Sequence, residues 1–172
     1  SVPSYDFRLL DSPVAELLSN VYWQAAYNVP WGEDTPGNQA MMAALREAYP
    51  DRRPSDAFIT GWNESITMHE VLKRAIANGD LTRQGVIDAA NSIEEIDFGG
   101  TAANQRYAGE PNDYVNRELA IFKPNLEKYT AAGGADQTLS QEGATTGSEL
   151  FKDFFVSDAA KNFEFNEPCY SL

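Results

Sequence analysis

The sequence has little of the chemistry that most catalytic and metal-binding sites need. It contains one cysteine, Cys169, and one histidine, His69, among 172 residues. A single cysteine allows no internal disulfide and no cysteine cluster for a metal. His69 is followed by Glu70, but the second histidine of the zinc-protease pattern H-E-x-x-H is missing, and no Ser-His or Cys-His pair has a plausible spacing. The glycine pairs at 99–100 and 133–134 fit neither nucleotide-binding fingerprint. We therefore expect no metal, no cofactor and no enzymatic activity.

Positive charge and long apolar runs are also scarce. The 13 Lys and Arg residues are outnumbered by 26 Asp and Glu residues, which gives a net charge of -13. Nucleic acids and anionic lipid surfaces bind clusters of Lys and Arg, so this balance argues against both as partners. No apolar run approaches the roughly 20 residues that a membrane-spanning helix needs. The mean hydropathy of -0.44 and the 42% of hydrophobic residues are typical of a globular protein.

The most strongly patterned stretch is residues 54–80. Its apolar residues recur at steps of three and four, which is typical of a helix with one buried face. Ser55 can cap the start of this helix, and Gly79 can end it in a left-handed conformation. Gly61 interrupts the run beside Trp62, and a glycine inside a helix costs about 1 kcal/mol relative to alanine. We therefore expect the helix to pack or kink where something approaches Trp62 closely.

Shorter signals predict the other elements. Thr35 and Thr82 are typical N-caps, and Pro13 is typical of a first helical turn. The glycines of residues 98–100 predict a turn with positive φ angles. The segment from residue 127 is rich in Gly, Ala and Thr and carries no motif, although residues 150–156 are apolar enough to dock on something. We expect helices at residues 13–18, 36–49, 55–78 and 83–93, strands at 21–27 and 114–122, and a loop or turn at 5–10.

Four short motifs occur in an order that resembles a known family. They are W-G-E-D-T-P-G-N-Q-A-M-M at residues 31–42, G-W-N at 61–63, G-D-L-T-R-Q-G-V-I-D-A-A at 79–90 and F-G-G at 98–100. With their surroundings, roughly residues 10–125, they resemble the C-terminal half of a type I periplasmic binding protein. These proteins are the extracytoplasmic receptors of ABC importers in the branched-chain amino acid and amide group. The resemblance implies an α/β fold, as the C-terminal portion of a two-lobed structure with parallel sheets flanked by helices.

The resemblance also implies how the chain is divided. Residues 1–51 are expected in the second lobe and residues 54–108 in the first, with hinge strands near residues 50–54 and 109–113. Residues 114–125 return to the second lobe, and residues 126–172 form a C-terminal tail that packs on the lobes.

The resemblance further implies that the chain is a fragment. It opens without an initiator Met or a signal peptide, so we expect a cut product whose precursor has a signal peptide and whose N-terminal half is missing. Because its sheet edges would lack neighbours, the fragment alone is expected to dimerise or swap. Cys169 either pairs with a cysteine in the missing half or stays an unpaired thiol in the tail.

The function implied is solute binding for an ABC importer. The ligand is a small organic molecule, such as an amino acid, an amide or an aromatic acid, held in the cleft between the lobes, and the partners are the permease subunits. The location is periplasmic or extracellular, in bacteria, with a lipid anchor or after secretion. Two alternatives remain open from the residues themselves: a small α/β enzyme that uses carboxylates such as Glu64 or Glu110, and a non-catalytic interaction domain.

Aromatic residues are the first candidates for ligand contacts, because small-molecule clefts are mostly apolar with a few polar anchors. The residues that we expect near the ligand are Tyr22, Trp23, Trp31, Trp62, Asn63 and Glu64. Strand alternation turns only one of Tyr22 and Trp23 inward, and we favour Tyr22. Trp62 matches the aromatic of the family's G-Y-D motif but is equally compatible with core packing. Trp31 either lines a cleft rim or packs between lobes.

Two polar residues follow Trp62. Asn63 stands where the family usually has Asp, which puts a charge-based role at this position in doubt. Glu64 can accept a ligand's ammonium group, or it is a solvated carboxylate on the helix surface.

Overall fold

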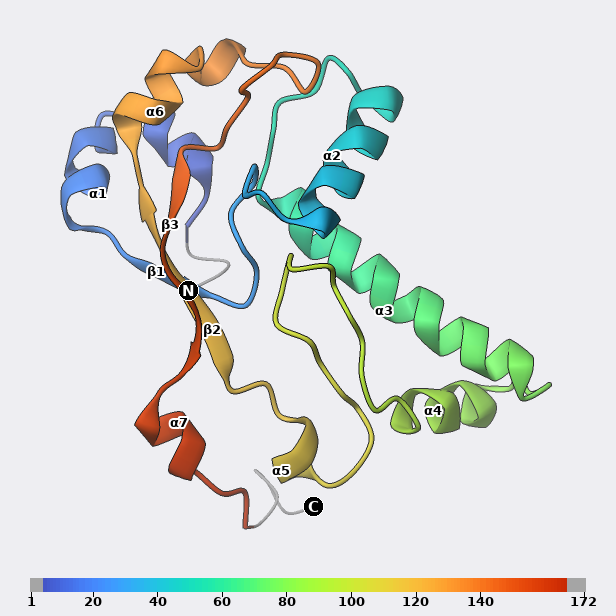
Figure 1. Ribbon diagram of the computed structural model, residues 1–172. Helices are drawn as coiled ribbons and strands as arrows, with labels where there is room; N and C mark the ends of the chain where they lie inside the picture. The colour runs from blue at the N-terminus through green and yellow to red at the C-terminus, as the bar shows by residue number, and fades with distance from the viewer. Residues whose placement is uncertain (1–4, 167–172) are drawn as a thin grey trace.

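The computed structural model describes residues 5–166, with a sheet along one side of the molecule and the three longest helices along the other (Figure 1). Helices α1 and α6 lie at one end of the sheet, and α5 and α7 lie at the other end. None of the helices in the described part is long and apolar enough to cross a membrane. In chain order the elements are η1 (Phe7–Asp11), α1 (Ala15–Val21), β1 (Gln24–Ala26), α2 (Pro36–Ala48), α3 (Ala57–Ala77), α4 (Arg83–Asn91), α5 (Pro111–Tyr114), β2 (Glu118–Pro124), α6 (Leu126–Ala131), η2 (Gly134–Asp136), β3 (Ser148–Val156) and α7 (Asp158–Asn162).

The three long helices follow the predicted caps. The Thr35 side chain accepts a hydrogen bond from the backbone N–H of Asn38 at the start of α2, and Thr82 accepts one from Gly85 at the start of α4. Gly79 follows α3 with a φ of 73°, the left-handed conformation that glycine adopts without strain. These signals are local, so the sequence alone was enough to predict them.

The start of α3 differs from the prediction by one residue. Asp56, not Ser55, occupies the N-cap position, and its side chain makes no capping hydrogen bond. Its carboxylate is used elsewhere, as described below. Helix α3 packs against the core at Trp62, as expected, but within residues 5–166 nothing approaches Gly61 itself. Helix α3 runs unbroken through this glycine, and no atom lies within 4 Å of where its Cβ would be.

Several shorter elements differ from the predictions because tertiary contacts decide them. Residues 7–11 form a 3₁₀-helix where a loop was expected. Helix α1 begins at Ala15 instead of Pro13 and continues to Val21, so β1 is left with only Gln24–Ala26 of the predicted strand 21–27. The second predicted strand, 114–122, begins only at Glu118, since Pro111–Tyr114 form the short helix α5.

The sheet corrects one part of the predicted fold class. Its strand order is β1-β2-β3, and both pairs are antiparallel, with Ala25 opposite Ile121 and Leu119 opposite Phe155. A parallel sheet was expected. Strands β2 and β3 instead follow one another with a reversal of the chain between them, whereas parallel neighbours need a crossover back to the same end. The mixed α/β class itself is correct.

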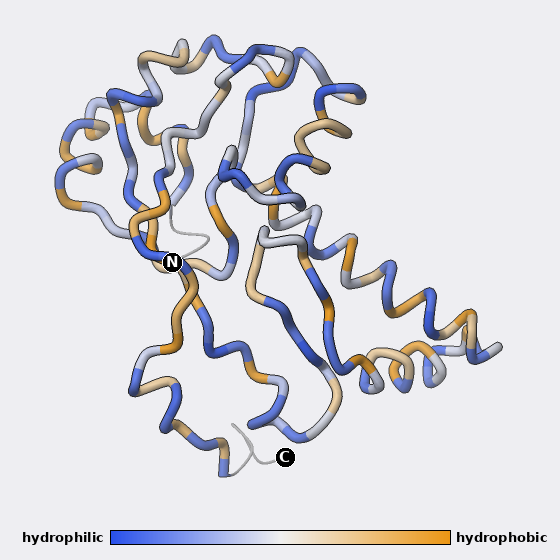
Figure 2. Tube along the Cα trace, in the orientation of Figure 1, coloured by the Kyte–Doolittle hydropathy of each residue, from blue (hydrophilic) through white to orange (hydrophobic). Residues whose placement is uncertain are grey.

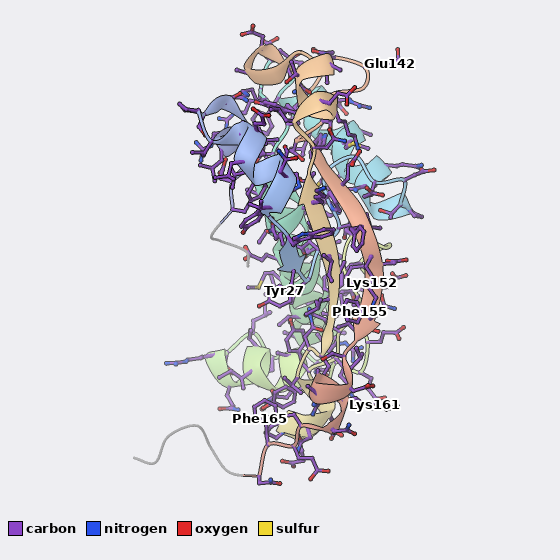
Figure 3. All side chains as sticks on the ribbon, turned by 90° about the vertical axis from the view of Figure 1, so that its left-hand side faces the viewer. Tyr27, Glu142, Lys152, Phe155, Lys161 and Phe165 are labelled. Atoms are coloured by element: carbon purple, nitrogen blue, oxygen red, sulfur yellow. The ribbon has the colours of Figure 1, made fainter. Side chains whose placement is uncertain are left out.

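Strand β3 lies in the segment for which no strand was predicted. It pairs with β2 along most of its length, with shifts of register around Ile121. The view onto the sheet in Figure 3 shows Lys152 and Phe155 of β3 on the outer side, with the Lys152 ammonium 3.7 Å from the centre of the Phe155 ring. The C-terminal segment is therefore part of the sheet.

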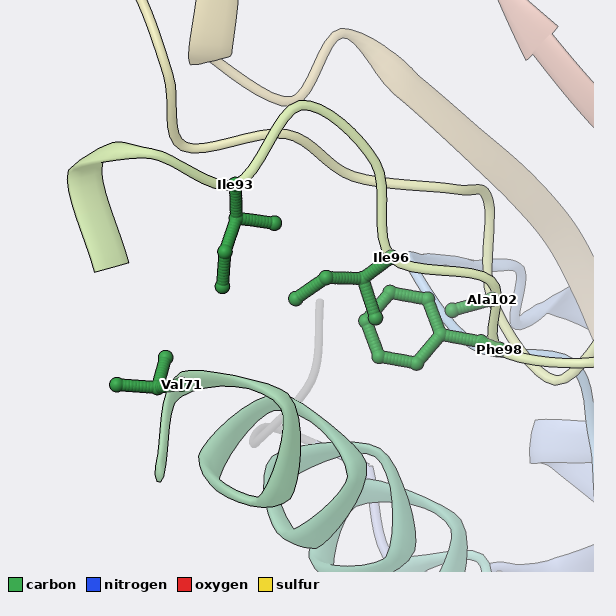
Figure 4. Packing of buried hydrophobic residues seen from close by; sticks show 5 residues of the cluster. All are labelled: Val71, Ile93, Ile96, Phe98 and Ala102. Carbon is green, nitrogen blue, oxygen red and sulfur yellow. The ribbon is translucent and has the colours of Figure 1, made fainter. Parts of the chain in front are cut away.

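One part of the core lies between α3 and the chain that follows α4. Val71 of α3 faces Ile93, Ile96, Phe98 and Ala102 in this cluster (Figure 4). Along α3 and α4, hydrophobic and hydrophilic stretches alternate (Figure 2), as expected for helices with one buried side.

A second part of the core joins α2 to α3. Trp31, Met41 and Ile59 are almost completely buried and share one cluster with Leu139 from the loop before β3. Met41 was expected in the second lobe and Ile59 in the first, yet both belong to this one cluster. The division of the chain into two lobes stays a prediction.

The turn at residues 98–100 is confirmed. Gly99 and Gly100 have φ angles of 61° and 82°, and the Gly99 carbonyl accepts a hydrogen bond of 2.8 Å from the N–H of Gly37 at the start of α2. A Cβ on Gly37 would lie 2.5 Å from the carbonyl oxygen of Phe98. Only glycine lets the turn and the helix approach this closely.

Candidate functional site

A pocket of about 450 Å³ lies where the sheet, residues 5–7 and the N-terminal part of α3 meet. Its apolar wall includes Ala26 of β1, Phe122 of β2 and Val29 of the following loop. Gly61 lines the pocket from α3, and the space where a side chain would stand is empty. The pocket is lined by Tyr5, Asp6, Phe7, Gln24, Ala26, Asn28, Val29, Ser55, Asp56, Ala57, Thr60, Gly61, Glu64 and Phe122.

Three polar side chains of the pocket are candidates for ligand contacts. Gln24 is only 8% exposed. The Tyr5 hydroxyl is buried and has no hydrogen-bond partner within residues 5–166. Glu64 is exposed and forms no ion pair within that range. Since buried polar groups in folded proteins are nearly always hydrogen-bonded, the Tyr5 hydroxyl is a natural contact for a ligand.

Asp56 behaves differently, because its carboxylate is already satisfied. One oxygen accepts hydrogen bonds of 2.8 Å from the backbone N–H of Trp31 and from the Thr146 hydroxyl. The other oxygen accepts one of 2.9 Å from the Ser148 hydroxyl. The residue borders the pocket, but its carboxylate is enclosed by protein, and this burial raises the pKa of Asp56 above its ordinary value despite the three donors. Asp56 thus connects the loop before α2, the start of α3 and the start of β3.

Asn63 lies behind the pocket in a chain of side-chain hydrogen bonds. Its amide nitrogen donates to the Asn28 side-chain oxygen at 3.0 Å, and its own side-chain oxygen lies 2.6 Å from the Thr101 hydroxyl, which can donate to it. The Asn28 amide in turn donates to the Thr60 hydroxyl at 3.1 Å. An amide at residue 63 can donate and accept here, whereas a carboxylate can only accept. The chain therefore holds Asn28 and Thr60 in place on the pocket wall.

Tyr22 and Trp23, two of the aromatic candidates, are neighbours in the chain but lie in different surroundings. The Tyr22 ring stacks on Tyr5 of the pocket wall, with ring centres 5.2 Å apart. Trp23 instead meets Phe151 edge-on at 4.4 Å on the other side of the sheet, with the Lys123 ammonium over its ring. Both residues precede β1, but the backbone at Tyr22 is already extended, and neighbouring side chains of an extended chain point to opposite sides.

The other two tryptophans lie in the core between α2 and α3. Trp31 is 2% exposed and packs beside Phe58, with ring centres 6.0 Å apart. Trp62 is partly buried against the same cluster. Neither lines the pocket. Of the six predicted residues only Glu64 lines it, whereas Tyr22 and Asn63 contact residues of its wall, Tyr5 and Asn28.

The polar residues of the pocket wall that were not predicted include Tyr5, Gln24, Asn28 and Thr60. For Gln24 a signal was available, because a polar residue two positions after Tyr22 lies on the same face of an extended strand. For Tyr5 there was none, since its place depends on how residues 5–7 pack against the sheet.

Another hollow of residues 5–166 is larger but holds none of the predicted residues. It has a volume of about 810 Å³ and lies beside α1 and α6. Among residues 5–166 there is no group of three or more His, Cys, Asp or Glu side chains that could hold a metal.

Comparisons with known proteins place this fold. A solved structure, the fatty acid ABC transporter substrate-binding protein from Thermomonospora curvata, superposes with a TM-score of 0.75 at 24% sequence identity. The match covers 93% of this chain but only 36% of that one, so the present chain spans little more than a third of its structural relative. No curated protein matches the chain.

The family assignment rests on the sequence itself. Residues 2–135, well over half of the chain, match the family described as periplasmic binding protein. Proteins of this family bind their solutes and do not transform them, in agreement with the predicted lack of enzymatic activity. The chain therefore belongs to the periplasmic binding proteins, of the type I group that the sequence motifs predicted.

Proposed function

We propose that this chain is part of the solute-binding receptor of a bacterial ABC importer, and that its pocket forms one wall of the ligand cleft. The observation that supports the proposal best is a pocket with an apolar wall, bordered by the buried and unpartnered Tyr5 hydroxyl, by Gln24 and by the exposed Glu64. Ligand sites of small molecules have this composition. Bound solute would favour the closed cleft through its higher affinity for that state, and the closed form would be presented to the permease.

The ligand is a small organic molecule. Our first candidates are the amino acids, amides and aromatic acids that the sequence motifs suggest. The structural relative is named for fatty acids, which adds medium-length fatty acids to the compounds to be tested. At 24% identity the structural similarity supports the shared fold but does not identify the ligand of this chain.

We further propose that the cleft is completed by additional polypeptide of the same receptor, the N-terminal half. Met68, Leu72 and Ile76 follow one another at steps of four on α3, and all three are exposed. Such a stripe on a helix is normally covered. A chain that matches 36% of its relative leaves ample polypeptide to cover it. Mixing the chain with the N-terminal half should give a 1:1 complex in sedimentation, and a dimer of this chain that ignores that half would contradict the proposal.

The receptor is expected in the periplasm or outside the cell, either lipid-anchored or secreted. Cys169 lies outside the described residues. Its pairing with the N-terminal half is a proposal that peptide mapping under non-reducing conditions tests directly.

A pocket-filling substitution tests the ligand site. Gly61→Leu in the intact receptor adds a side chain where no atom stands within 4 Å, so the helix tolerates it and the pocket loses volume. Ser65→Leu, one turn further along α3 and outside the pocket, is the matched control. We expect Gly61→Leu to abolish the thermal shift that a library of amino acids, amides and fatty acids gives with the native receptor, while Ser65→Leu keeps it. Binding that survives Gly61→Leu would place the ligand elsewhere, and a receptor that binds none of these compounds would favour an interaction domain.

A further inference from the structure

Residues 157–165, here called the C-terminal arm, lie against the connection between α5 and β2. The arm consists of α7 and the residues around it, and α7 and α5 lie at the same end of the sheet (Figure 1). The arm follows the stretch 2–135 that matches the family, so it belongs to the part of the chain outside that match. None of the arm residues is buried. Apolar burial therefore contributes little to holding the arm in place.

Arg117, between α5 and β2, makes the first contact that holds the arm. Its guanidinium donates a hydrogen bond to the carbonyl of Ala160 in α7 and one of 2.7 Å to the carbonyl of Phe163, the C-cap residue of α7. The last carbonyls of a helix have no partner within the helix, and a cation there also meets the negative end of the helix dipole. Arg117 thus supplies from outside the donors that the end of α7 lacks.

Asn112 of α5 makes the second contact. Its side-chain oxygen accepts a hydrogen bond of 2.8 Å from the backbone N–H of Phe165, and its side-chain nitrogen donates one of 3.1 Å to the Phe165 carbonyl. The same oxygen also accepts a hydrogen bond of 3.2 Å from Arg117. The arm, Arg117 and α5 are therefore joined in one hydrogen-bond network.

The arm also covers a small apolar hollow of about 260 Å³. Phe163 and Phe165 line it from the arm, whereas Tyr27 and Leu119 line it from the sheet. Tyr27 and Phe163 are each still 57% exposed, so this cover is incomplete. The hydrogen bonds of Arg117 and Asn112 are accordingly the main contacts that hold the arm.

We propose that the C-terminal arm is a releasable clasp that restrains the movement of α5 relative to the sheet. Segments with few buried apolar contacts and exposed hydrogen bonds open locally at a low cost in free energy. Helix α5 lies in the connection, residues 109–117, through which the chain passes from the core beside α3 and α4 to β2. Opening of the arm removes the contacts of Asn112 and Arg117, so the parts that this connection joins can then move more freely. This inference goes beyond solute binding and needs no knowledge of the ligand.

Amide hydrogen exchange in the intact receptor, without ligand, tests the inference. The Tyr114 and Val115 amides report on α5, because they donate to the carbonyls of residues 110 and 111, and the Lys161 amide reports on α7. Arg117→Ala removes the bonds to both arm carbonyls and should make these amides exchange at least tenfold faster. Phe165→Pro removes the N–H that Asn112 accepts from and changes no atom of α5 or of Arg117. It should also accelerate exchange in α5, which only the arm can then transmit.

Arg106→Ala is the matched control for Arg117→Ala, because Arg106 is exposed, lies shortly before α5 and bonds the nearby Ala108 carbonyl. Phe165→Leu is the control for the proline, since it keeps the N–H and an apolar side chain. Both controls should leave exchange in α5 and α7 within twofold of the native receptor, and amides of β2 should stay unchanged in every variant.

Faster exchange in α7 with unchanged exchange in α5 would show that the arm does not restrain α5. Unchanged exchange of Lys161 in Arg117→Ala would show that Arg117 does not hold the arm. Equal acceleration of β2 would show a general loss of stability instead of a local clasp. Each of these results overturns the inference and leaves the solute-binding function untouched, because no ligand enters the measurement.

Discussion

Replacing Asp56 should reveal how strongly one carboxylate holds three distant segments together. In the Asp56→Ala variant the Trp31 N–H and the hydroxyls of Thr146 and Ser148 lose their acceptor, and all three residues are at most 2% exposed. An unsatisfied buried donor costs about 1–3 kcal/mol. The two hydroxyls can rotate toward other acceptors, and water can enter from the adjoining pocket, so the sum is reduced. We expect a loss of about 3–4 kcal/mol in the free energy of unfolding.

The Asp56→Asn variant separates the hydrogen bonds from the charge. Its side-chain oxygen can still accept from the backbone N–H of Trp31 and from the Thr146 hydroxyl, and its amide nitrogen can donate to the Ser148 hydroxyl oxygen. The substitution also removes a buried charge, which is itself unfavourable, and this gain offsets part of any weakened hydrogen bonding. We therefore expect the free energy of unfolding to fall by about 1 kcal/mol or less.

Urea unfolding of the intact receptor, followed by tryptophan fluorescence, measures both variants. With a typical slope of about 1.5 kcal/mol per molar urea, Asp56→Ala should lower the midpoint by about 2 M. Asp56→Asn should lower it by well under 1 M. Equal midpoints for native receptor and Asp56→Ala would refute the claim that this carboxylate joins the three segments. Equal losses for Ala and Asn would show that the charge, and not the hydrogen bonds, matters.

Three further predictions concern pH, helix capping and glycine packing. Because burial raises the pKa of Asp56, the folded chain binds more protons than the unfolded chain between about pH 4 and that raised pKa. The contribution of this group to stability is therefore largest below about pH 4 and is lost as the pH rises through the folded pKa. The urea midpoint of the native receptor should accordingly fall relative to that of Asp56→Asn as the pH rises over this range. Thr82→Ala removes the acceptor for the Gly85 N–H and should cost about 1 kcal/mol, whereas Thr82→Ser should restore most of it. Gly61→Ala should raise the melting temperature slightly, by the equivalent of about 0.5–1 kcal/mol, since its Cβ meets nothing within 4 Å. Gly37→Ala should lower it clearly because of the carbonyl at 2.5 Å, and a reversed order for these two variants would contradict the packing described.

The sequence was sufficient where the structure is decided by neighbours in the chain. Helices α2 and α4 begin directly after Thr35 and Thr82 because each threonine caps an N–H three residues later. Gly79 ends α3 for a similarly local reason. Strand β3 was not predicted, because its place is set by pairing with β2, about 30 residues earlier, and its sequence lacks regular alternation.

The site was predicted in part, for a related reason. Glu64 was identified because it follows a motif, and Tyr22 because strands alternate. Trp31 was a reasonable candidate for a cleft rim, and only the packing against Met41 shows that it is buried in the core. No pattern in the sequence distinguishes a buried tryptophan from one that contacts a ligand.

The partners of Asp56 also bear on where the polypeptide can be shortened. The stretch that matches the family ends at residue 135, but Thr146 and Ser148, two of the three donors, come after it. A recombinant version ended at the family boundary would also lose β3, and β2 would become an open edge with unpaired backbone groups. Poor yield or aggregation of such a truncated protein would then reflect a lost edge strand and would say nothing about the binding site.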